Sequence, residues 1–440
     1  MALVESFQSV FRIPELKKRI LFTAGLLIIY RLGSHVPTPG INGAALESFF
    51  AAQSGTLFGL YDLFAGGALS KATIFALGIM PYINASIILQ LLGSVIPYLE
   101  KLRKEGEEGR KKITQITRYA TVFFAVVQSF GFCLFLEGLR GADGVTPVVP
   151  DPGFGFRLLT MLTQTSGTIF VMWLGEQITE RGIGNGISLI IFINIVARFP
   201  NDVLNTARQV MSGQLNIFAG LLLTVFMLLV IAAVVAMTQA QRKIPVQYAK
   251  RIVGRRMVGS SSMHIPLRVN AAGVIPIIFA QSIIAFPSTL ASFFRDNDLM
   301  AQVANIFAPH HIVYGVLYAA IIIFFTYFYT AIVLDPSELA DNMKKHGGFI
   351  PGIRPGKKTA EYIDRVLTRI TLPGAIFLAA IAVLPDILLY RFNVPFYFGG
   401  TSLLIVVGVA LDTLQQVESH LLVRHYDGFM KRGKLKARRY

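Results

Sequence analysis

Three glycines at alternate positions, Gly182, Gly184 and Gly186 in the stretch TERGIGNGIS, give the chain its nearest approach to a phosphate-binding loop. A dinucleotide site would need a preceding β-strand in a βαβ unit and a later acidic residue for the ribose. This stretch instead follows one long apolar run and enters another. We therefore interpret the glycines as a tight reversal between two helices, with the start of the second helix held close to its neighbour.

No other stretch carries the residues of an enzyme site. The sequence lacks G-x-x-x-x-G-K-[ST], H-E-x-x-H and G-x-S-x-G motifs, so any energy from ATP must come from a partner. His310 and His311 form an isolated pair in an expected external loop, which is more typical of solvent-exposed side chains than of a metal site. Cys133, the only cysteine, lies in an apolar run and is interpreted as a packing residue. We expect no enzyme activity, metal or cofactor.

The elements that must position any site are apolar runs, and they predict an all-α membrane protein. The chain has 440 residues, of which 53% are hydrophobic, and a mean hydropathy of +0.58. Runs of about 20 apolar residues are typical of membrane-spanning helices.

Charged residues inside these runs are sparse, chiefly Arg31 and Asp412, which argues against an ion-coupled transporter and an intramembrane protease. The first run lacks a cleavage site, so we expect it to be a retained helix. The ten runs lie near 20–36, 72–97, 119–137, 154–174, 183–199, 215–237, 270–290, 312–334, 370–390 and 397–417.

Basic residues are concentrated in the loops on one side of these ten runs. The formal net charge is +16, and 33 of the 41 Lys and Arg residues fall on the side that holds both termini. Because basic loops stay in the cytoplasm, we expect both termini there. Residues 238–268 contain seven basic and no acidic residues. This loop is either a docking surface for ribosomal RNA, anionic lipid or a soluble motor protein, or it carries topology-determining charge alone.

Residues 57–97 have the pattern of a broken membrane helix. Apolar residues in 57–64 precede Gly66 and Gly67, and a long apolar run containing Pro81 follows. Irregular backbone at membrane depth survives only where it is buried in protein or lines a wet cavity, so a broken helix indicates a pathway. The alternative is an ordinary span preceded by a short helix on the membrane surface.

Seven motifs in the chain resemble those of the SecY family, the channel subunits of the bacterial protein-translocation complex. In order, they are FAGGALSKATIFALGIMPYINASIILQLL (64–92), KEGEEGRKKITQITRYAT (104–121), WLGEQITERGIGNGIS (173–188), RKIPVQYAKR (242–251), VNAAGVIPIIFA (269–280), GGFIPGIRPGKKTAEYID (347–364) and PFYFGGTSLLIVVGVALD (395–412). The resemblance covers essentially the whole chain.

The resemblance implies ten transmembrane helices in two pseudo-symmetric, inverted five-helix halves around a central pore. The N-terminal half would be 1–199, and the C-terminal half, with large cytoplasmic loops 238–268 and 335–369 and a basic tail, would be 200–440. It implies a channel in the inner membrane of a bacterium that translocates unfolded secretory polypeptides, recognises signal sequences and releases transmembrane segments sideways into membrane lipid. The implied partners are SecE-like and SecG-like small membrane subunits, the SecA motor ATPase and the ribosome.

The resemblance also implies roles for four sets of residues. The pore ring, an apolar constriction, comprises Ile79, Ile83, Ile187, Ile191, Ile278 and Ile405. The plug at 57–69, which closes the outer funnel and swings on its glycines, includes Leu57, Leu60, Tyr61, Leu63, Phe64, Gly66 and Gly67. The lateral gate includes the polar residues Asn84, Ser86, Gln128, Gln281 and Ser282. The docking surface includes Arg354, Lys250, Arg251, Arg255 and Arg256.

Two classes of function remain at this point. A protein-conducting channel needs an apolar waist, which dewets and excludes ions while yielding around a peptide. A secondary transporter with inverted repeats needs fixed polar ligands for a small solute at mid-membrane. The six isoleucines favour the channel.

Overall fold

The computed structural model describes most of the chain and divides it into two compact units. Unit 1 comprises Met1–Asn201 with Val409–Tyr440, and unit 2 comprises Asp202–Gly408. The described residues are 13–52, 62, 65–141, 145–213, 216–248, 251–253, 256–258, 263–293, 311–392 and 400–432.

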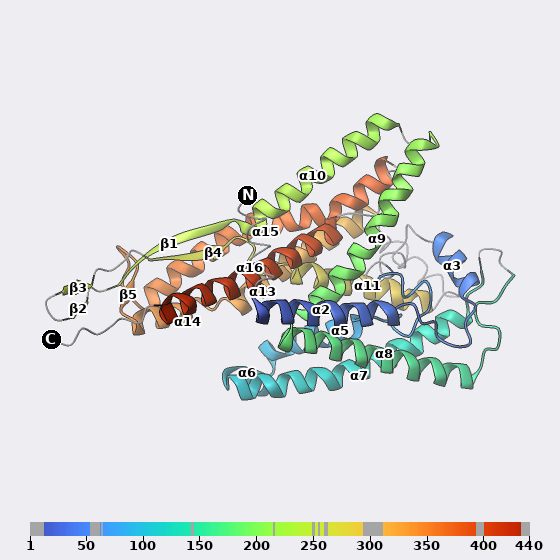
Figure 1. The fold of residues 1–440 in the computed structure, drawn as a ribbon, viewed down its shortest axis with the longest axis horizontal. Helices are drawn as coiled ribbons and strands as arrows, with labels where there is room; N and C mark the ends of the chain where they lie inside the picture. The colour runs from blue at the N-terminus through green and yellow to red at the C-terminus, as the bar shows by residue number, and fades with distance from the viewer. Residues whose placement is uncertain are drawn as a thin grey trace. The chain divides into compact units, whose positions relative to one another are not determined.

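In unit 1, helices α2, α7 and α8 run along one another (Figure 1). The long helices α7 and α8 pack together, and α5 packs against α7. At one end a core of buried apolar residues, including Leu46, Phe50 and Leu136, joins α3 to the end of α7. The helices are α2 (Pro14–Gly33), α3 (Gly43–Ala52), α5 (Met80–Val95), α6 (Pro97–Lys104), α7 (Glu107–Glu137), α8 (Phe154–Arg181) and α9 (Gly186–Met211), the last of which continues into unit 2.

In unit 2 the structure describes four long helices, a three-stranded sheet in the order β4-β1-β5 and a two-stranded sheet of β2 and β3. Helix α13 packs on both α11 and α15. The helices are α10 (Ile217–Gln239), α11 (Ile275–Phe293), α13 (Ile312–Val333), α14 (Pro336–Lys345), α15 (Lys357–Phe392) and the start of α16 (Gly400–Arg432). The strands are β1 (Gln241–Tyr248), β2 (Arg251–Val253), β3 (Arg256–Val258), β4 (Met263–Arg268) and β5 (Gly348–Phe349).

Length and composition identify a multi-pass membrane protein. Among the described residues, seven helices are long and apolar enough to cross a membrane, and an eighth span results if α5 and α6 form one bent span. Each of the ten predicted apolar runs contains a helix, with α2, α5 and α11 as the three outside the seven. The predicted helical membrane class is therefore confirmed.

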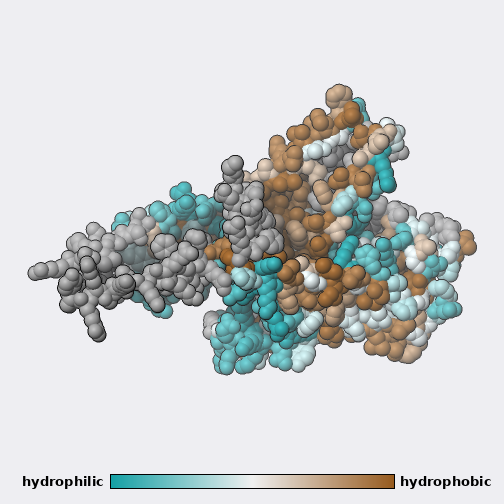
Figure 2. Space-filling model, in the orientation of Figure 1, coloured by the Kyte–Doolittle hydropathy of each residue, from teal (hydrophilic) through white to brown (hydrophobic). Residues whose placement is uncertain are grey.

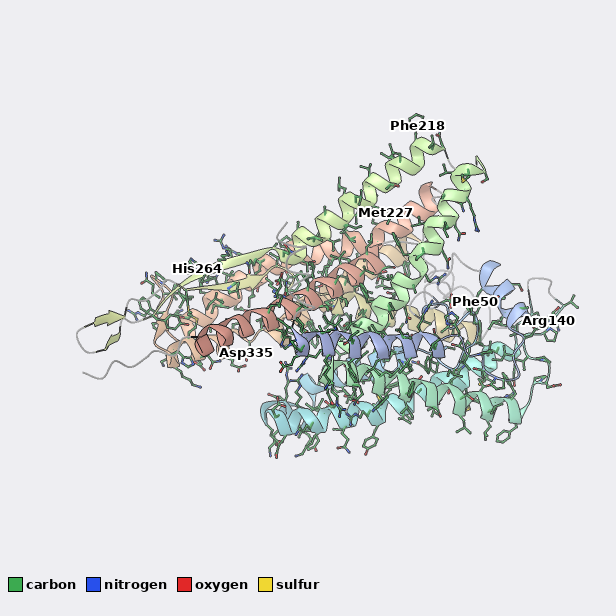
Figure 3. All side chains as sticks on the ribbon, viewed as in Figure 1. Phe50, Arg140, Phe218, Met227, His264 and Asp335 are labelled. Carbon is green, nitrogen blue, oxygen red and sulfur yellow. The ribbon has the colours of Figure 1, made fainter. Side chains whose placement is uncertain are left out.

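The lipid-compatible surface is clearest on α10. Its side chains Phe218, Leu222 and Leu228 are exposed. Figure 2 shows an apolar surface along this helix, and Figure 3 places Phe218 at its tip and Met227 midway along it. A helix that is apolar all round suits a hydrocarbon environment, because no polar face has to be solvated.

The predicted reversal between the fourth and fifth spans is confirmed. Helix α8 ends at Arg181 and α9 begins at Gly186, with Gly184 at φ +86° between them. A side chain at Gly186 would collide with the carbonyl oxygen of Gly175 on α8. Only glycine permits this approach, which is why the triplet resembles a phosphate loop without being one.

The predicted boundaries of the second span are wrong. Residues 65–79 form turns instead of the first part of a helix over 72–97, and α5 begins only at Met80. Positive φ angles at Ala72 (+42°) and Gly78 (+53°) are incompatible with a right-handed helix. At its other end, α5 stops before Pro97, where the chain bends by 100° into the charged helix α6.

Candidate functional site: the pore segments and the pre-α5 segment

We use the name pre-α5 segment for residues 65–79, the non-helical backbone that leads into α5. Its polar groups find partners in the loop after α2. The Thr38 amide donates to the Ala72 carbonyl at 2.9 Å, and the Ile74 amide donates to the Val36 carbonyl at 3.0 Å. This pairing satisfies groups that the hydrocarbon core could not solvate. The segment is therefore irregular backbone that protein buries.

Helices α2 and α8 pack tightly on the pre-α5 segment. The Phe75 ring stacks on the ring of the fully buried Tyr30, with centroids 5.6 Å apart. A side chain at Gly33 would lie 2.6 Å from Phe75 Cζ, and one at Gly167 would collide with the Ile74 carbonyl oxygen. Small residues at these two positions let the helices close on the segment.

Four charged or polar side chains surround the start of the pre-α5 segment. Asp62 is 6% exposed, and its carboxylate accepts hydrogen bonds from the Ser70 amide at 2.8 Å and from Arg198 Nη1 at 3.2 Å. Arg31 Nη1 donates to the Gly66 carbonyl at 3.0 Å. Asn194 donates to the Tyr30 hydroxyl at 2.8 Å. These contacts explain why charges occur in otherwise apolar stretches.

The four ring isoleucines of unit 1 lie where the pre-α5 segment ends and where α9 begins. Ile79 is the residue before α5, and its carbonyl accepts from the Ile83 amide at 3.1 Å. Ile187 and Ile191 are one helical turn apart on α9, so they share a face. Ile79, Ile83 and Ile191 are buried, whereas Ile187 is partly exposed.

The two ring isoleucines of unit 2 lie near the starts of α11 and α16. Ile278 is in the first turn of α11 and partly exposed, whereas Ile405 is 1% exposed. The start of α16 packs against the residues before α11, since a side chain at Gly408 would lie 2.8 Å from Val274 Cγ1. The role of all six isoleucines as one ring stays a prediction.

Most of the predicted plug lies outside the described residues, namely Leu57, Leu60, Tyr61, Leu63 and Phe64. Gly66 and Gly67 are described and adopt φ angles of +66° and +83°. A side chain at Gly66 would lie 2.5 Å from Asn194 Oδ1, so this glycine allows a close approach to α9 as well as a left-handed turn.

The five residues predicted for the lateral gate lie on α5, α7 and α11. Ser86 accepts a hydrogen bond from Gln90 on its own helix at 3.2 Å. Ser282 donates to the Ile278 carbonyl on its own helix at 2.9 Å. Gln281 is 8% exposed, and its Oε1 has no hydrogen-bond partner among the residues that the structure describes. Asn84 and Gln128 are partly exposed. Their shared role as a gate is a prediction.

The predicted docking loops are organised by a β-ribbon that the sequence did not reveal. β1 pairs antiparallel with β4 and, at Gln247 and Tyr248, with β5. Ile244, Val246 and Leu267 of the ribbon share a core with Ile350 and Ile363. This core anchors both loops to the start of α15. His264 marks the exposed ribbon in Figure 3.

Arg354 is exposed in the turn between β5 and α15. Gly352 and Gly356 flank it with φ angles of +81° and +97°. The Thr359 hydroxyl donates to the Arg354 carbonyl at 3.0 Å, which fixes the backbone that presents the side chain. Arg251 and Arg256 begin the paired strands β2 and β3, whereas Lys250 and Arg255 lie outside the described residues.

The described residues offer no metal site, because they contain no group of three or more His, Cys, Asp or Glu side chains suited to hold an ion. Cys133 is fully buried, and its thiol donates to the Arg157 carbonyl across 3.8 Å. These contacts agree with a packing role.

Comparison with known proteins identifies the family. A family model described as SecY matches residues 73–414. The protein translocase subunit SecY of Aquifex aeolicus is 47% identical over 97% of this chain and 100% of its own length. That of Escherichia coli K12 is 49% identical over 96% of this chain and 95% of its own. The chain belongs to the SecY family. This membership supports a protein-conducting channel and gives no support to the secondary transporter.

Solved structures show the same fold. A protein-conducting channel aligns with a TM-score of 0.66 and 17% identity, covering 95% of this chain and 94% of its own. A SecY channel, described as one whose plug domain stabilises the closed state and maintains a membrane seal, aligns with a TM-score of 0.65 and 17% identity over the same shares. The canine Sec61 channel in a ribosome complex aligns with a TM-score of 0.61 and 16% identity, again over 95% and 94%.

Sequence reasoning missed Asp62 and Arg198 as a pair. They are separated by 136 positions, and no periodic pattern connects them. The only sequence signal for this pair was that each residue is charged and lies beside apolar residues. The SecY resemblance assigns Asp62 to the plug and Arg198 to the fifth span. A charge in such a place has to find a partner, because an unpaired buried charge is strongly unfavourable.

Proposed function

We propose that the chain forms the pore through which unfolded secretory polypeptides cross the membrane. The observation that carries the proposal is the pre-α5 segment, a non-helical backbone buried among α2, α8 and α9 that ends at Ile79. Such a segment at membrane depth is costly unless it serves a pathway. The six isoleucines would form the apolar waist, and the chain itself would supply no catalytic chemistry.

The proposal includes two inverted halves, 1–199 and 200–440, that part to release transmembrane segments into lipid. The polar residues on α5, α7 and α11 would line that exit. The tight, glycine-mediated contacts of α8 with α9 and with the pre-α5 segment support an N-terminal half that moves as one body.

The proposed partners act on the cytoplasmic side. A SecA-like motor ATPase or a ribosome would dock on the β-ribbon and on the Arg354 turn, and SecE-like and SecG-like subunits would complete the complex. The shared core of the two loops supports one combined docking surface. The distribution of basic residues supports cytoplasmic termini, and the bacterial relatives support an inner-membrane location.

Site-directed cross-linking tests the pore. Cys133→Ser would remove the sole cysteine, and Ile278→Cys or Ile191→Cys would then place one thiol at the proposed waist. Leu228→Cys, on the exposed face of α10, is the matched control. In complexes reconstituted with the motor, we expect a disulfide between a waist cysteine and a cysteine in a stalled secretory precursor, only when ATP is present. Failure of both waist positions, in a preparation that binds its partners, would overturn the proposal.

Arg354→Glu should reduce motor-driven transport by about tenfold without affecting assembly. Arginine presents a rigid cationic fork that suits carboxylate or phosphate, and charge reversal turns attraction into repulsion. Transport of a precursor into vesicles measures the effect. Arg208→Glu, an equal charge change at an exposed position beyond the predicted external end of the fifth span, should transport normally. A normal transport rate for Arg354→Glu would remove this residue from the docking surface.

A further inference from the structure

The glycine reversal, residues 182–186, is held by two helices that are distant from it in the sequence. The Ile183 amide donates to the Thr23 hydroxyl of α2 at 3.1 Å, across 160 positions of the chain. The Gly184 amide donates to Oε1 of Gln416 on α16 at 2.9 Å, across 232 positions. Ile183 and Gly184 are buried, so these side-chain oxygens act as acceptors where water would otherwise be needed.

The reversal leads directly into the proposed waist. The Gly186 amide donates to the Thr179 hydroxyl of α8 at 2.9 Å, and Asn185 Oδ1 accepts from the Ile187 amide at 3.1 Å, which caps the start of α9. Amides that a phosphate-binding loop would present to an anion are thus occupied by side chains. Because Ile187 directly follows the reversal and Ile191 lies one turn later, the place of the reversal determines the place of both waist residues.

Apolar packing supports the same attachment. Leu16 of α2 and Ile183 of the reversal form a buried cluster, and Val417 and Leu421 of α16 pack against it. This part of α16 belongs to unit 1, together with α2 and the reversal. Polar bonds and apolar contacts therefore hold the two helices and the reversal together.

The Thr23 hydroxyl is enclosed by its partners. Thr23 is 8% exposed, and its hydroxyl donates to the Arg19 carbonyl at 3.0 Å while it accepts from the Ile183 amide. A side chain at Gly182 would collide with the hydroxyl oxygen. Removal of this oxygen would leave a buried amide without its acceptor, and an unpaired buried donor is unfavourable.

We propose that Thr23 and Gln416 are positioning residues for the pore, because through the glycine reversal they fix where α9 begins and so hold Ile187 and Ile191 at the waist. This inference rests on the proposed pore function and adds residues outside the ring. Neither side chain needs to touch the moving polypeptide. Since α16 also carries Ile405, the Gln416 bond ties α9 to a helix that supplies another proposed waist residue.

Cross-linking at two waist positions tests the role of Thr23. In a Cys133→Ser background, Ile191→Cys reports on α9 and Ile278→Cys reports on α11. Thr23→Val keeps the shape of the side chain and removes the hydroxyl. We expect it to lower the yield of the disulfide between Ile191→Cys and a stalled precursor by about fivefold, because the unpaired Ile183 amide disfavours the native position of the reversal. The Ile278→Cys yield should not change, and Thr23→Ser, which retains the hydroxyl, should restore the Ile191→Cys yield.

Gln416→Leu repeats the test from α16. It removes the acceptor of the Gly184 amide, so we expect a lower Ile191→Cys yield, whereas Gln416→Glu retains an acceptor oxygen and should behave as the unmodified chain does. Gln115→Leu is the matched control. It is the same substitution at an exposed position of unit 1, where the side chain donates to the Tyr119 hydroxyl of its own helix. This control should leave the yield unchanged.

Failure of the positioning role can be distinguished from failure of the pore. Equal losses at Ile191→Cys and Ile278→Cys would indicate general destabilisation and would overturn the inference, as would unchanged yields at both. The pore stands in either case if both cysteines cross-link when Thr23 and Gln416 are unmodified. If neither cysteine cross-links even then, while the partners bind, the proposed function itself fails.

Discussion

Serine at Ile79, Ile83, Ile187 and Ile191 is expected to raise the resting ion conductance of the reconstituted complex by at least about tenfold. These four side chains lie at the junction of the pre-α5 segment with α5 and at the start of α9. A narrow apolar ring excludes ions because water leaves it, and hydroxyl groups would allow water to remain. Planar-bilayer recording without precursor or motor measures the change directly.

The control for this substitution uses isoleucines on other surfaces. Ile28, Ile29 and Ile376 are between 46% and 60% exposed in the chain, so serine there changes a peripheral surface. We expect these variants to conduct as the unmodified complex does. An unchanged conductance in the four-serine variant, with the complex intact, would contradict the ring assignment.

Alanine at Gly167 is expected to lower the stability of the folded chain substantially. Its Cβ would collide with the Ile74 carbonyl oxygen and lie 2.9 Å from the Ile74 carbonyl carbon and 3.2 Å from Phe75 Cδ1. Two of these atoms are backbone, and that backbone is fixed by hydrogen bonds to the loop after α2. Overpacking of this kind costs about 1–3 kcal/mol, and more where the neighbours cannot move. A lower melting temperature in detergent measures it.

Gly93→Ala is the matched control, and we expect it not to lower the melting temperature. Gly93 lies within α5, and nothing is within 4 Å of the position its Cβ would take. Alanine is favoured over glycine in a helix by about 1 kcal/mol, so this variant should melt at the same or a higher temperature. Equal melting temperatures for Gly167→Ala and Gly93→Ala would show that α8 and the pre-α5 segment are less closely packed than the structure indicates.

The sequence by itself determined the helical membrane class, the number and order of apolar helices and the glycine reversal before α9. These features depend on local properties. An apolar run must become a helix in lipid, because no water satisfies its backbone, and Gly184 and Gly186 reveal a tight turn by their residue type alone. The resemblance of seven motifs to the SecY family implied that the helices surround a pore.

Only the tertiary structure decided the form of the pre-α5 segment. Residues 72–79 are apolar enough for a helix, yet they adopt turns because Val36 and Thr38 supply backbone partners that the local sequence cannot reveal. The β-ribbon likewise depends on the pairing of residues 241–246 with 263–268, which the basic composition of this loop did not indicate. The partnership of Asp62 with Arg198 arises where two apolar elements meet. The physical reason is that a buried carboxylate such as Asp62 requires a cationic partner, and only the fold determines which cation lies within reach.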